Sequence, residues 1–140
     1  MRLALLAALG ATLASGLTAA TARDATLCFG RALTASKAEG LKPILPEKGK
    51  VHLALVRLGP EDGMFAAGQV VAVLRDFLAA GRVGSFDVVS VDGDERTGAQ
   101  AVARASITDR DGRRGTVSLR LGFQPEDGRW VLREVKETGE

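Results

Sequence analysis

The sequence has few of the residues on which most metal, redox and nucleophilic sites depend. Among its 140 residues there are one cysteine, one histidine and no tyrosine. The single cysteine, Cys28, cannot form a disulfide within the chain, and no spacing of His and Cys is typical of a zinc site. No serine lies beside His52, and no glycine-rich phosphate loop follows an expected strand. The sequence therefore predicts no metal, no cofactor and no nucleophilic triad.

Aromatic residues are also scarce, at 4% of the chain, and the charges do not favour one sign. Lysines and arginines number 19 against 17 acids, and the two signs are interspersed. Nucleic-acid-binding surfaces are typically basic stripes with aromatic side chains for stacking, so we expect no nucleic-acid partner. The acidic run Asp92–Glu95 lacks the ligand offsets of a calcium loop of about twelve residues. It is interpreted as a polar turn.

The first part of the chain is predicted to be a signal peptide. Between Arg2 and Arg23 there is no charge, and an apolar half, Leu3–Leu13, precedes small residues that end in an A-x-A pattern. We predict a signal peptide over 1–22 and one exported domain, periplasmic or secreted, over 23–140. The alternative is an uncleaved anchor, because the segment reaches the ~20 residues that a membrane span needs. The small residues of its second half favour cleavage, after which we expect no membrane association.

The remaining chain is predicted to be α+β. One helix is expected from Asp24 to about Lys37, with Cys28 on its buried side, and Asp62 is expected to cap a longer helix that Gly81 ends. We expect N-terminal helices plus this long helix to pack in a curved antiparallel sheet. The long helix is expected over 64–80, and the strands over 51–58, 85–91, 99–107, 116–123 and 128–136.

Two of the expected strands alternate strictly between apolar and polar residues, which is typical of a sheet covered on one side. In 99–107 the apolar face is mostly alanine, and in 116–123 it carries larger side chains. An alanine face either lets a helix pack closely or leaves volume for a ligand. The turns Asp111–Gly112 and Asp127–Gly128 predict hairpins.

This order of elements resembles the nuclear transport factor 2-like superfamily, whose cone-shaped α+β fold is also called cystatin-like. A closer likeness is to a family of short exported bacterial proteins of unknown function. It rests on Gln69–Phe77, on Ser85–Phe86 and on Gly128–Trp130, and it covers roughly 50–136. The superfamily includes ketosteroid isomerases, dehydratases, polyketide cyclases and non-enzymatic binding domains. The resemblance therefore implies a fold and leaves the function open.

An isomerase of this superfamily pairs an acidic base with a hydroxyl-bearing oxyanion donor. The absence of tyrosine excludes the tyrosine version of that donor, and also the Tyr-and-His arrangement of related dehydratases. His52 is the one side chain that titrates near neutrality, and it is either a general base or an ordinary strand histidine. A pocket acid would be Asp87, Asp92 or Glu134. Glu134 is expected to face inward, because it shares the alternation of Trp130 and Leu132.

We predict a non-catalytic binding or accessory domain that takes an apolar small molecule in its cone or associates through its sheet. The candidate pocket residues are His52, Phe86, Ala101, Ala103, Leu119, Leu121 and Trp130. The alternative is a small isomerase or dehydratase that uses His52 or a pocket carboxylate.

A sheet that associates needs exposed side chains on its outer face. Arg104, Arg120 and Arg133 are the interface candidates, expected to project there toward an acidic partner or a second copy in a homodimer. The competing interpretation pairs these arginines with acids of neighbouring strands, such as Asp87. A third hypothesis is that the domain has no usable cavity and that its sheet serves only to bind a protein.

Overall fold

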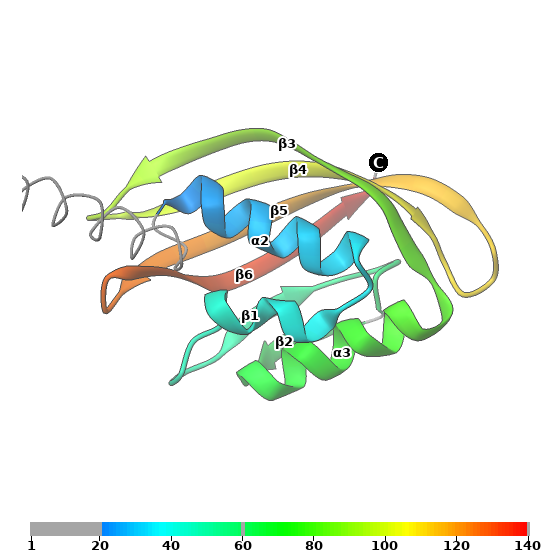
Figure 1. Ribbon diagram of the computed structural model, residues 1–140, viewed down its shortest axis with the longest axis horizontal. Coiled ribbons are helices and arrows are strands. Elements are labelled where there is room, and N and C mark those ends of the chain that lie inside the picture. Colours follow the sequence, from blue (N-terminus) through cyan, green and yellow to red (C-terminus); the bar gives the residue numbers. More distant parts are fainter. Residues whose placement is uncertain (1–20, 60, 140) are drawn as a thin grey trace, which may run out of the picture.

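The computed structural model describes residues 21–59 and 61–139, so the predicted signal peptide lies outside the described residues except for its last two. The helices lie on one side of a curved sheet (Figure 1). The elements in chain order are α2 (Ala22–Thr34), the 3₁₀ helix η1 (Ala38–Ile44), β1 (Val51–Ala54), β2 (Asp62–Phe65), α3 (Ala67–Ala80), β3 (Arg82–Asp94), β4 (Gly98–Thr108), β5 (Arg114–Glu126) and β6 (Arg129–Gly139).

The described strands form one six-stranded sheet in the order β2-β1-β6-β5-β4-β3. All neighbours are antiparallel except β1 and β6, which run parallel. The predicted α+β class is therefore confirmed, with one parallel pair that the sequence analysis did not anticipate. Because of that pair, the last strand of the chain lies in the middle of the sheet.

The first helix begins and ends earlier than predicted. Thr21 is its N-cap, because the Thr21 hydroxyl accepts a hydrogen bond from the backbone N–H of Asp24 at 3.0 Å. The helix ends at Thr34, and Ser36 then has a left-handed backbone with φ of 56°. The chain therefore turns before Lys37, which had been expected to lie within the helix.

The segment before α3 is a strand, where the sequence analysis expected a loop and the start of the helix. Asp62–Phe65 pairs with β1, so Asp62 cannot cap the helix. Ala66 is the N-cap instead, and its backbone N–H donates to the side-chain oxygen of Gln69 at 2.8 Å. The first strand is also shorter than predicted, ending at Ala54. Gly81 ends α3 as expected.

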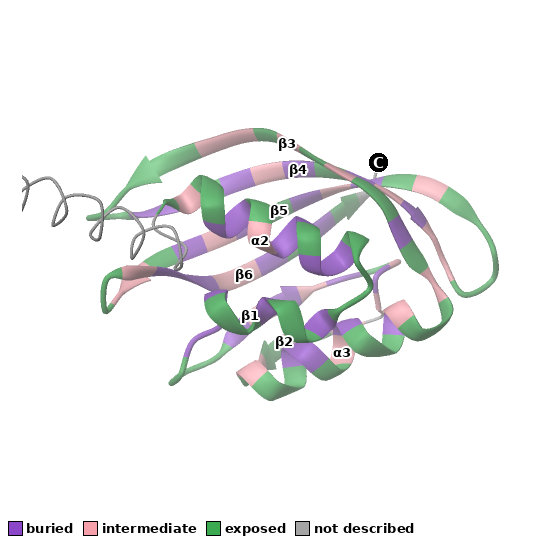
Figure 2. Cartoon of the chain, in the orientation of Figure 1, coloured by how far each residue is buried: buried purple, intermediate pink, exposed green. Residues whose placement is uncertain are grey.

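The core lies between the sheet and the helices α2, η1 and α3 (Figure 2). The alternation predicted for β4 and β5 is present, with inward side chains exposed by 6% or less. α2 lies close to the sheet at Gly30, where a Cβ atom would overlap the ring of Phe86. The Phe86 ring also lies 5.9 Å from that of Phe29. The alanine face of β4 thus accompanies close helix packing.

A β-bulge at Arg133 divides β6 into two parts. Phe123 pairs with Leu132, but Gly122 pairs with Glu134, so one residue of β6 has no partner. Since side chains alternate along a strand, this extra residue reverses which side chains face inward. Glu134 therefore points to the outer face of the sheet, and the prediction that it faces inward was wrong.

Candidate functional site

The face of the sheet turned away from the helices carries most of the exposed polar side chains of the strands. We call it the outer face. We describe it by two adjacent rows of residues that run across the strands. Within each row, every residue is paired in register with the next residue on the neighbouring strand. The first row is His52, Glu134, Gly122, Gln100 and Asp92, and the second is Ala54, Lys136, Arg120, Val102 and Ser90.

His52 lies in the first row between two carboxylates. Its Nδ1 is 3.1 Å from an oxygen of Glu134, and its Nε2 is 3.3 Å from an oxygen of Asp62. The hydrogen bonds to Glu134 and then to Asp62 raise the pKa of His52 above its ordinary value, although partial desolvation opposes them. The imidazole therefore lies between two carboxylates on an open face, with a side chain 37% exposed. Both of its ring nitrogens are within hydrogen-bond distance of a carboxylate oxygen.

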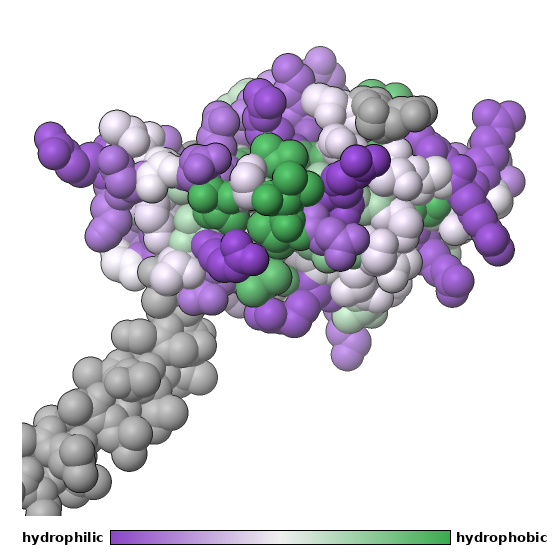
Figure 3. Space-filling model, turned by 90° about the horizontal axis from the view of Figure 1, so that it is seen from above, coloured by the Kyte–Doolittle hydropathy of each residue, from purple (hydrophilic) through white to green (hydrophobic). Residues whose placement is uncertain are grey.

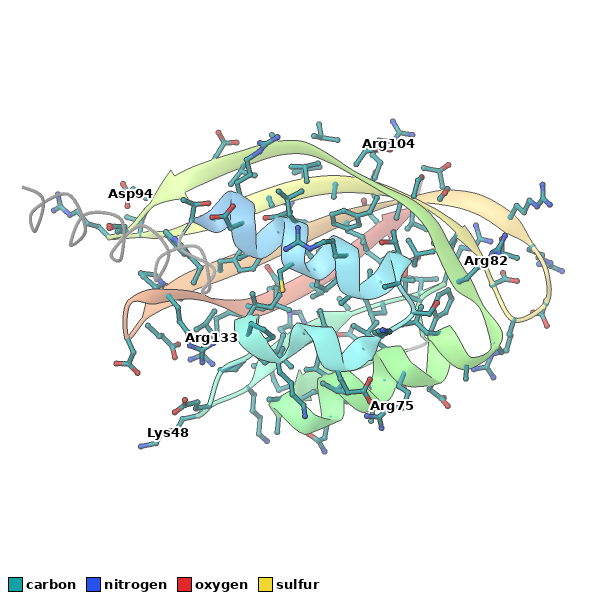
Figure 4. All side chains as sticks on the ribbon, in the orientation of Figure 1. Lys48, Arg75, Arg82, Asp94, Arg104 and Arg133 are labelled. Atoms are coloured by element: carbon teal, nitrogen blue, oxygen red, sulfur yellow. The ribbon has the colours of Figure 1, made fainter. Side chains whose placement is uncertain are left out.

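The second row continues into a basic cluster of Arg104, Arg120 and Lys136. Arg120 and Lys136 are directly opposite each other, and Arg104 is one step further along the neighbouring strand. Like charges in opposite positions destabilise a sheet. None of the three forms an ion pair within the described residues, although Asp87 is paired with Arg104 in register. Figure 4 shows Arg104 pointing outward from the sheet.

A hollow of about 440 Å³ lies beside this cluster, where the first row lacks a side chain at Gly122. Its charged lining residues are the carboxylates Glu134 and Asp92 and the cation Arg133, whose guanidinium is paired with Glu126. The outer face thus presents a projecting cation, Arg120, two residues along β5 from an acid-lined depression.

The third interface candidate, Arg133, differs from the other two. Its guanidinium donates to the backbone carbonyls of Lys48 at 3.3 Å and Lys50 at 3.2 Å, and it also pairs with Glu126. Figure 4 shows Arg133 on the side of Lys48, apart from Arg104. Its charge is therefore engaged within the chain, where it holds the loop before β1.

Four of the candidate pocket residues, Ala101, Ala103, Leu119 and Leu121, are exposed by 1% or less. Phe86 packs on α2, and His52 is on the outer face. Trp130 is different, because it lines a hollow at the start of α2. Ligand binding by the seven candidates stays a prediction, and in this structure they do not form one site.

Glu137 is a buried acid that the sequence analysis missed. It is 6% exposed and accepts hydrogen bonds from the backbone N–H groups of Val56, Arg57 and Leu58 at 2.9–3.0 Å. Val135 faces inward, and Glu137 lies two residues further along the same strand. This spacing would have assigned Glu137 to the inward face as well, had the bulge been known. Its oxygens are occupied by the turn after β1, which gives it a structural role.

A second candidate surface is the free edge at β3. Figure 3 shows a hydrophobic area on the side of the molecule where β3 and α2 face the viewer. The exposed large apolar side chains on these two elements are Leu27 and Val89. The edge is interrupted by register shifts at Gly84 and Val89, and bulges of this kind hinder pairing with another strand.

Among the described residues, no cluster of three or more His, Cys, Asp or Glu side chains could hold a metal ion. Within the same part of the chain, no helix has both the length and the apolar character that a membrane crossing requires.

No family model matches the sequence, and no curated protein sequence does. Solved structures do match. One is a protein from Thiobacillus denitrificans proposed to be a calcium/calmodulin-dependent protein kinase type II association domain, with TM-score 0.68 and 13% identity, covering 88% of this chain and 98% of that one. Another is a protein of the nuclear transport factor 2-like family from Streptomyces avermitilis, proposed to be a dehydratase, with TM-score 0.63 and 16% identity, covering 83% and 91%.

This chain has the nuclear transport factor 2-like fold. The fold that the resemblance implied is thus confirmed. A DUF4783 family protein from Bacteroides ovatus matches with TM-score 0.60 and 10% identity, covering 81% of this chain and 93% of that one. At these identities the likeness concerns the fold. The nuclear transport factor 2-like fold serves both association domains and dehydratase-type proteins, so the chemistry must be argued from the site.

Proposed function

We propose that this nuclear transport factor 2-like domain is a non-catalytic association module that forms a homodimer through its outer face. The observation that supports this most is the juxtaposition of Arg120 with the acid-lined hollow at Gly122, two residues away on the same strand. A surface that carries both a projection and a matching depression is complementary to a second copy of itself. Such self-complementarity is what an isologous twofold interface requires.

The pairing register determines how the two copies fit together. The twofold axis lies between the two sheets, runs across the strands and passes over Leu121. It places the first row of each copy opposite the second row of its partner. Arg120 of each copy then enters the hollow at Gly122 of the other, and Lys136 faces Glu134. Each contact occurs twice, and the like charges at Arg120 and Lys136 gain partners of opposite sign. Packed sheets lie ~10 Å apart, a separation that long side chains bridge.

The alternative functions have less support. The candidate pocket side chains at Ala101, Ala103, Leu119 and Leu121 are covered within the core, which leaves little room for an apolar ligand among them. A general base at His52 would need a free ring nitrogen, and both nitrogens lie within 3.3 Å of carboxylate oxygens of Glu134 and Asp62. A sheet used for association needs neither feature.

The first experiment measures the molar mass of the protein by light scattering across a dilution series. We expect, at the highest concentrations, twice the mass of the single chain as intact mass spectrometry gives it. Arg120→Glu and Gly122→Leu should each yield folded monomers, the first by repulsion and the second by filling the hollow. A Cβ at Gly122 lies 3.3 Å from the Cβ of Glu134, so its addition requires a shift of a few tenths of an ångström there. Arg110→Glu, in the exposed β4–β5 turn, is the matched control.

A mixing experiment tests the register itself. Lys136→Glu alone and Glu134→Lys alone should both be monomeric, because each sets like charges against each other across the axis. When the two variants are mixed, every contact again joins opposite charges, so a heterodimer should form. If the wild-type protein is monomeric at all concentrations, if both single variants dimerise as the wild-type protein does, or if two monomeric variants form no heterodimer when mixed, the proposed interface is wrong.

The proposal includes export, on the strength of the charge-free segment between Arg2 and Arg23. Cleavage after Ala22 would remove the Thr21 cap of α2, and Asp24 would then be the first side chain able to cap the helix. Intact mass spectrometry of protein from the culture medium and periplasm should find a chain that begins at Arg23. A chain found only in the cytoplasm with its first residues retained would contradict export.

A further inference from the structure

A second hollow of about 440 Å³ lies at the end of the sheet that carries the turn between β4 and β5, and we call it the Thr108 hollow. Three of its lining residues, Arg82, Thr108 and Arg114, are paired in register across β3, β4 and β5. Ile107 is buried against the core, so the neighbouring Thr108 faces outward. The hollow therefore belongs to the outer face, and Figure 4 shows Arg82 at this end of the sheet.

A bulge in β3 opens the hollow at Gly84. The register between β3 and β4 shifts between Val83 and Ser85, so Gly84 has no partner on β4. A Cβ atom at Gly84 would lie 3.1 Å from the hydroxyl oxygen of Ser106, which also lines the hollow. The missing side chain thus leaves space directly beside a hydroxyl group.

The charge of the Thr108 hollow is positive. Arg82 and Arg114 are both exposed, and neither forms an ion pair within the part of the chain that the structure describes. No acid is among the lining residues. Asp109, which follows Thr108, is held by the guanidinium of Arg57 at 3.2 Å. Two cations with no counter-charge in the hollow attract an anion.

The spacing of the two arginines suits a single anion between them. Neighbouring strands lie about 4.8 Å apart, so the backbones of Arg82 and Arg114, on either side of β4, are separated by about 10 Å. Arginine side chains are long enough to bridge such a gap, and each guanidinium presents a planar fork of donors that matches a phosphate group.

Hydroxyl groups supply the remaining donors. Ser106, Thr108 and Thr116 line the hollow, and Ser106 is paired in register with Thr116. The Ser106 hydroxyl lies 2.8 Å from that of Ser85, which fixes its position. A guanidinium donates hydrogen bonds and accepts none, whereas a hydroxyl can donate one. This set of groups favours a ligand with several acceptor oxygens and more than one negative charge.

We propose that the Thr108 hollow binds the phosphate group of a small phosphate monoester. The phosphate lies over Thr108, and the guanidiniums of Arg82 and Arg114 donate to its oxygens from either side. A phosphate diester has one charge and one terminal oxygen fewer, so it is the weaker ligand. The site is separate from the proposed dimer interface, because Thr116 lies about 16 Å along β5 from Leu121.

The test titrates the isotope-labelled protein, as isolated, with three probes and follows the backbone amide signals of the lining residues by NMR. The probes are methyl phosphate, inorganic phosphate and dimethyl phosphate at about pH 8, where the first two carry two negative charges and the third carries one. Ionic strength is held constant with sodium chloride, since salt screens exposed charges. We expect saturable shifts with methyl phosphate, half-complete at about 1 mM or below, and affinity at least about tenfold weaker for dimethyl phosphate.

Four variants test the assignment of roles. Arg82→Gln and Arg114→Gln should each weaken binding of methyl phosphate at least about tenfold, because each removes charge-assisted hydrogen bonds. Thr108→Val keeps the shape of the side chain, removes the hydroxyl and should weaken binding several-fold. Arg110→Gln, in the β4–β5 turn, loses the same charge outside the hollow and is the matched control, with a change below about twofold. Unchanged dispersion of the amide signals checks that each variant is folded.

Several results would overturn the proposal. Equal losses for Arg110→Gln and Arg82→Gln would show a general attraction to surface charge in place of a site. Equal affinity for the monoester and the diester, tighter binding of inorganic phosphate than of methyl phosphate, or no saturation by about 10 mM methyl phosphate would also contradict it. Arg120→Glu, which tests the dimer by light scattering, should leave phosphate binding within about twofold, so the failure of one proposal is distinguishable from the failure of the other.

Discussion

Glu137 allows the effect of one substitution on stability to be worked out from the structure. Its carboxylate holds the turn after β1 through the backbone N–H groups of Val56, Arg57 and Leu58. Val56 is 68% exposed, so water can replace the carboxylate at its N–H group. The N–H groups of Arg57 and Leu58 would lose their partner. A hydrogen bond to a charged group contributes about 1.5–3 kcal/mol.

Glu137→Ala should therefore lower the free energy of unfolding by about 3–5 kcal/mol, a large part of the ~5–15 kcal/mol of a typical domain. Glu137→Gln keeps the size of the side chain and one acceptor oxygen. It should cost about 1–2 kcal/mol, because neutral hydrogen bonds are roughly half as strong as charge-assisted ones. The order of stability expected is wild type, then Gln, then Ala.

Urea-induced unfolding measures these differences, and hydrogen exchange at residues 56–58 locates them. Glu95→Ala, in an exposed turn, is the control and should change stability by no more than about 0.5 kcal/mol. A loss below about 1 kcal/mol for Glu137→Ala, or unchanged exchange at 56–58, would refute the assignment of a structural role to this carboxylate.

Three further outcomes are expected. Gly30→Ala should destabilise the protein by about 1–3 kcal/mol in urea unfolding, since a Cβ there overlaps the ring of Phe86; in a Phe86→Leu background the cost should fall, and an equal cost in both would contradict the contact. The single imidazole should titrate by NMR with a pKa above 6.5, and Glu134→Gln should lower that pKa. Because folding raises this pKa, protonation of His52 stabilises the fold fully below pH 6.5, and the contribution is lost as the pH rises through the folded-state pKa; a folded-state pKa at or below 6.5 would contradict the paired geometry. Burial raises the pKa of the Cys28 thiol despite the nearby charge of Arg31, so a disulfide reagent should modify it at least about tenfold faster in urea than in buffer; equal rates would show that the folded thiol is accessible.

The parts of the fold that sequence patterns predicted correctly are those set by local alternation. The apolar faces of β4 and β5 are visible in the sequence, because every second residue is apolar over several positions. Gly81 at the end of α3 was predictable for a similar reason, since glycine commonly ends helices. These features depend on neighbours a few residues away.

The features that escaped prediction depend on distant neighbours. Asp62–Phe65 contains glycine and aspartate, which disfavour strands, and it is extended because β1 offers it an edge. The bulge at Arg133 has no local signature, and without it the alternation assigns Glu134 to the wrong face. The row that joins His52 to Glu134 requires a parallel pairing that no local pattern specifies.

The position of β6 between β5 and β1 has a consequence for the order of folding. His52 and Glu134 are 82 residues apart, and every contact between β1 and β6 closes a loop of about that length. A chain is synthesised from its N-terminus, so β1 and β2 emerge well before the strand that attaches them to the sheet. Until β6 is made, this hairpin has only its own two short strands, and an isolated two-stranded hairpin is marginally stable. We therefore expect a high contact order to slow the final step, in which β6 joins β1 and β2 to the antiparallel strands.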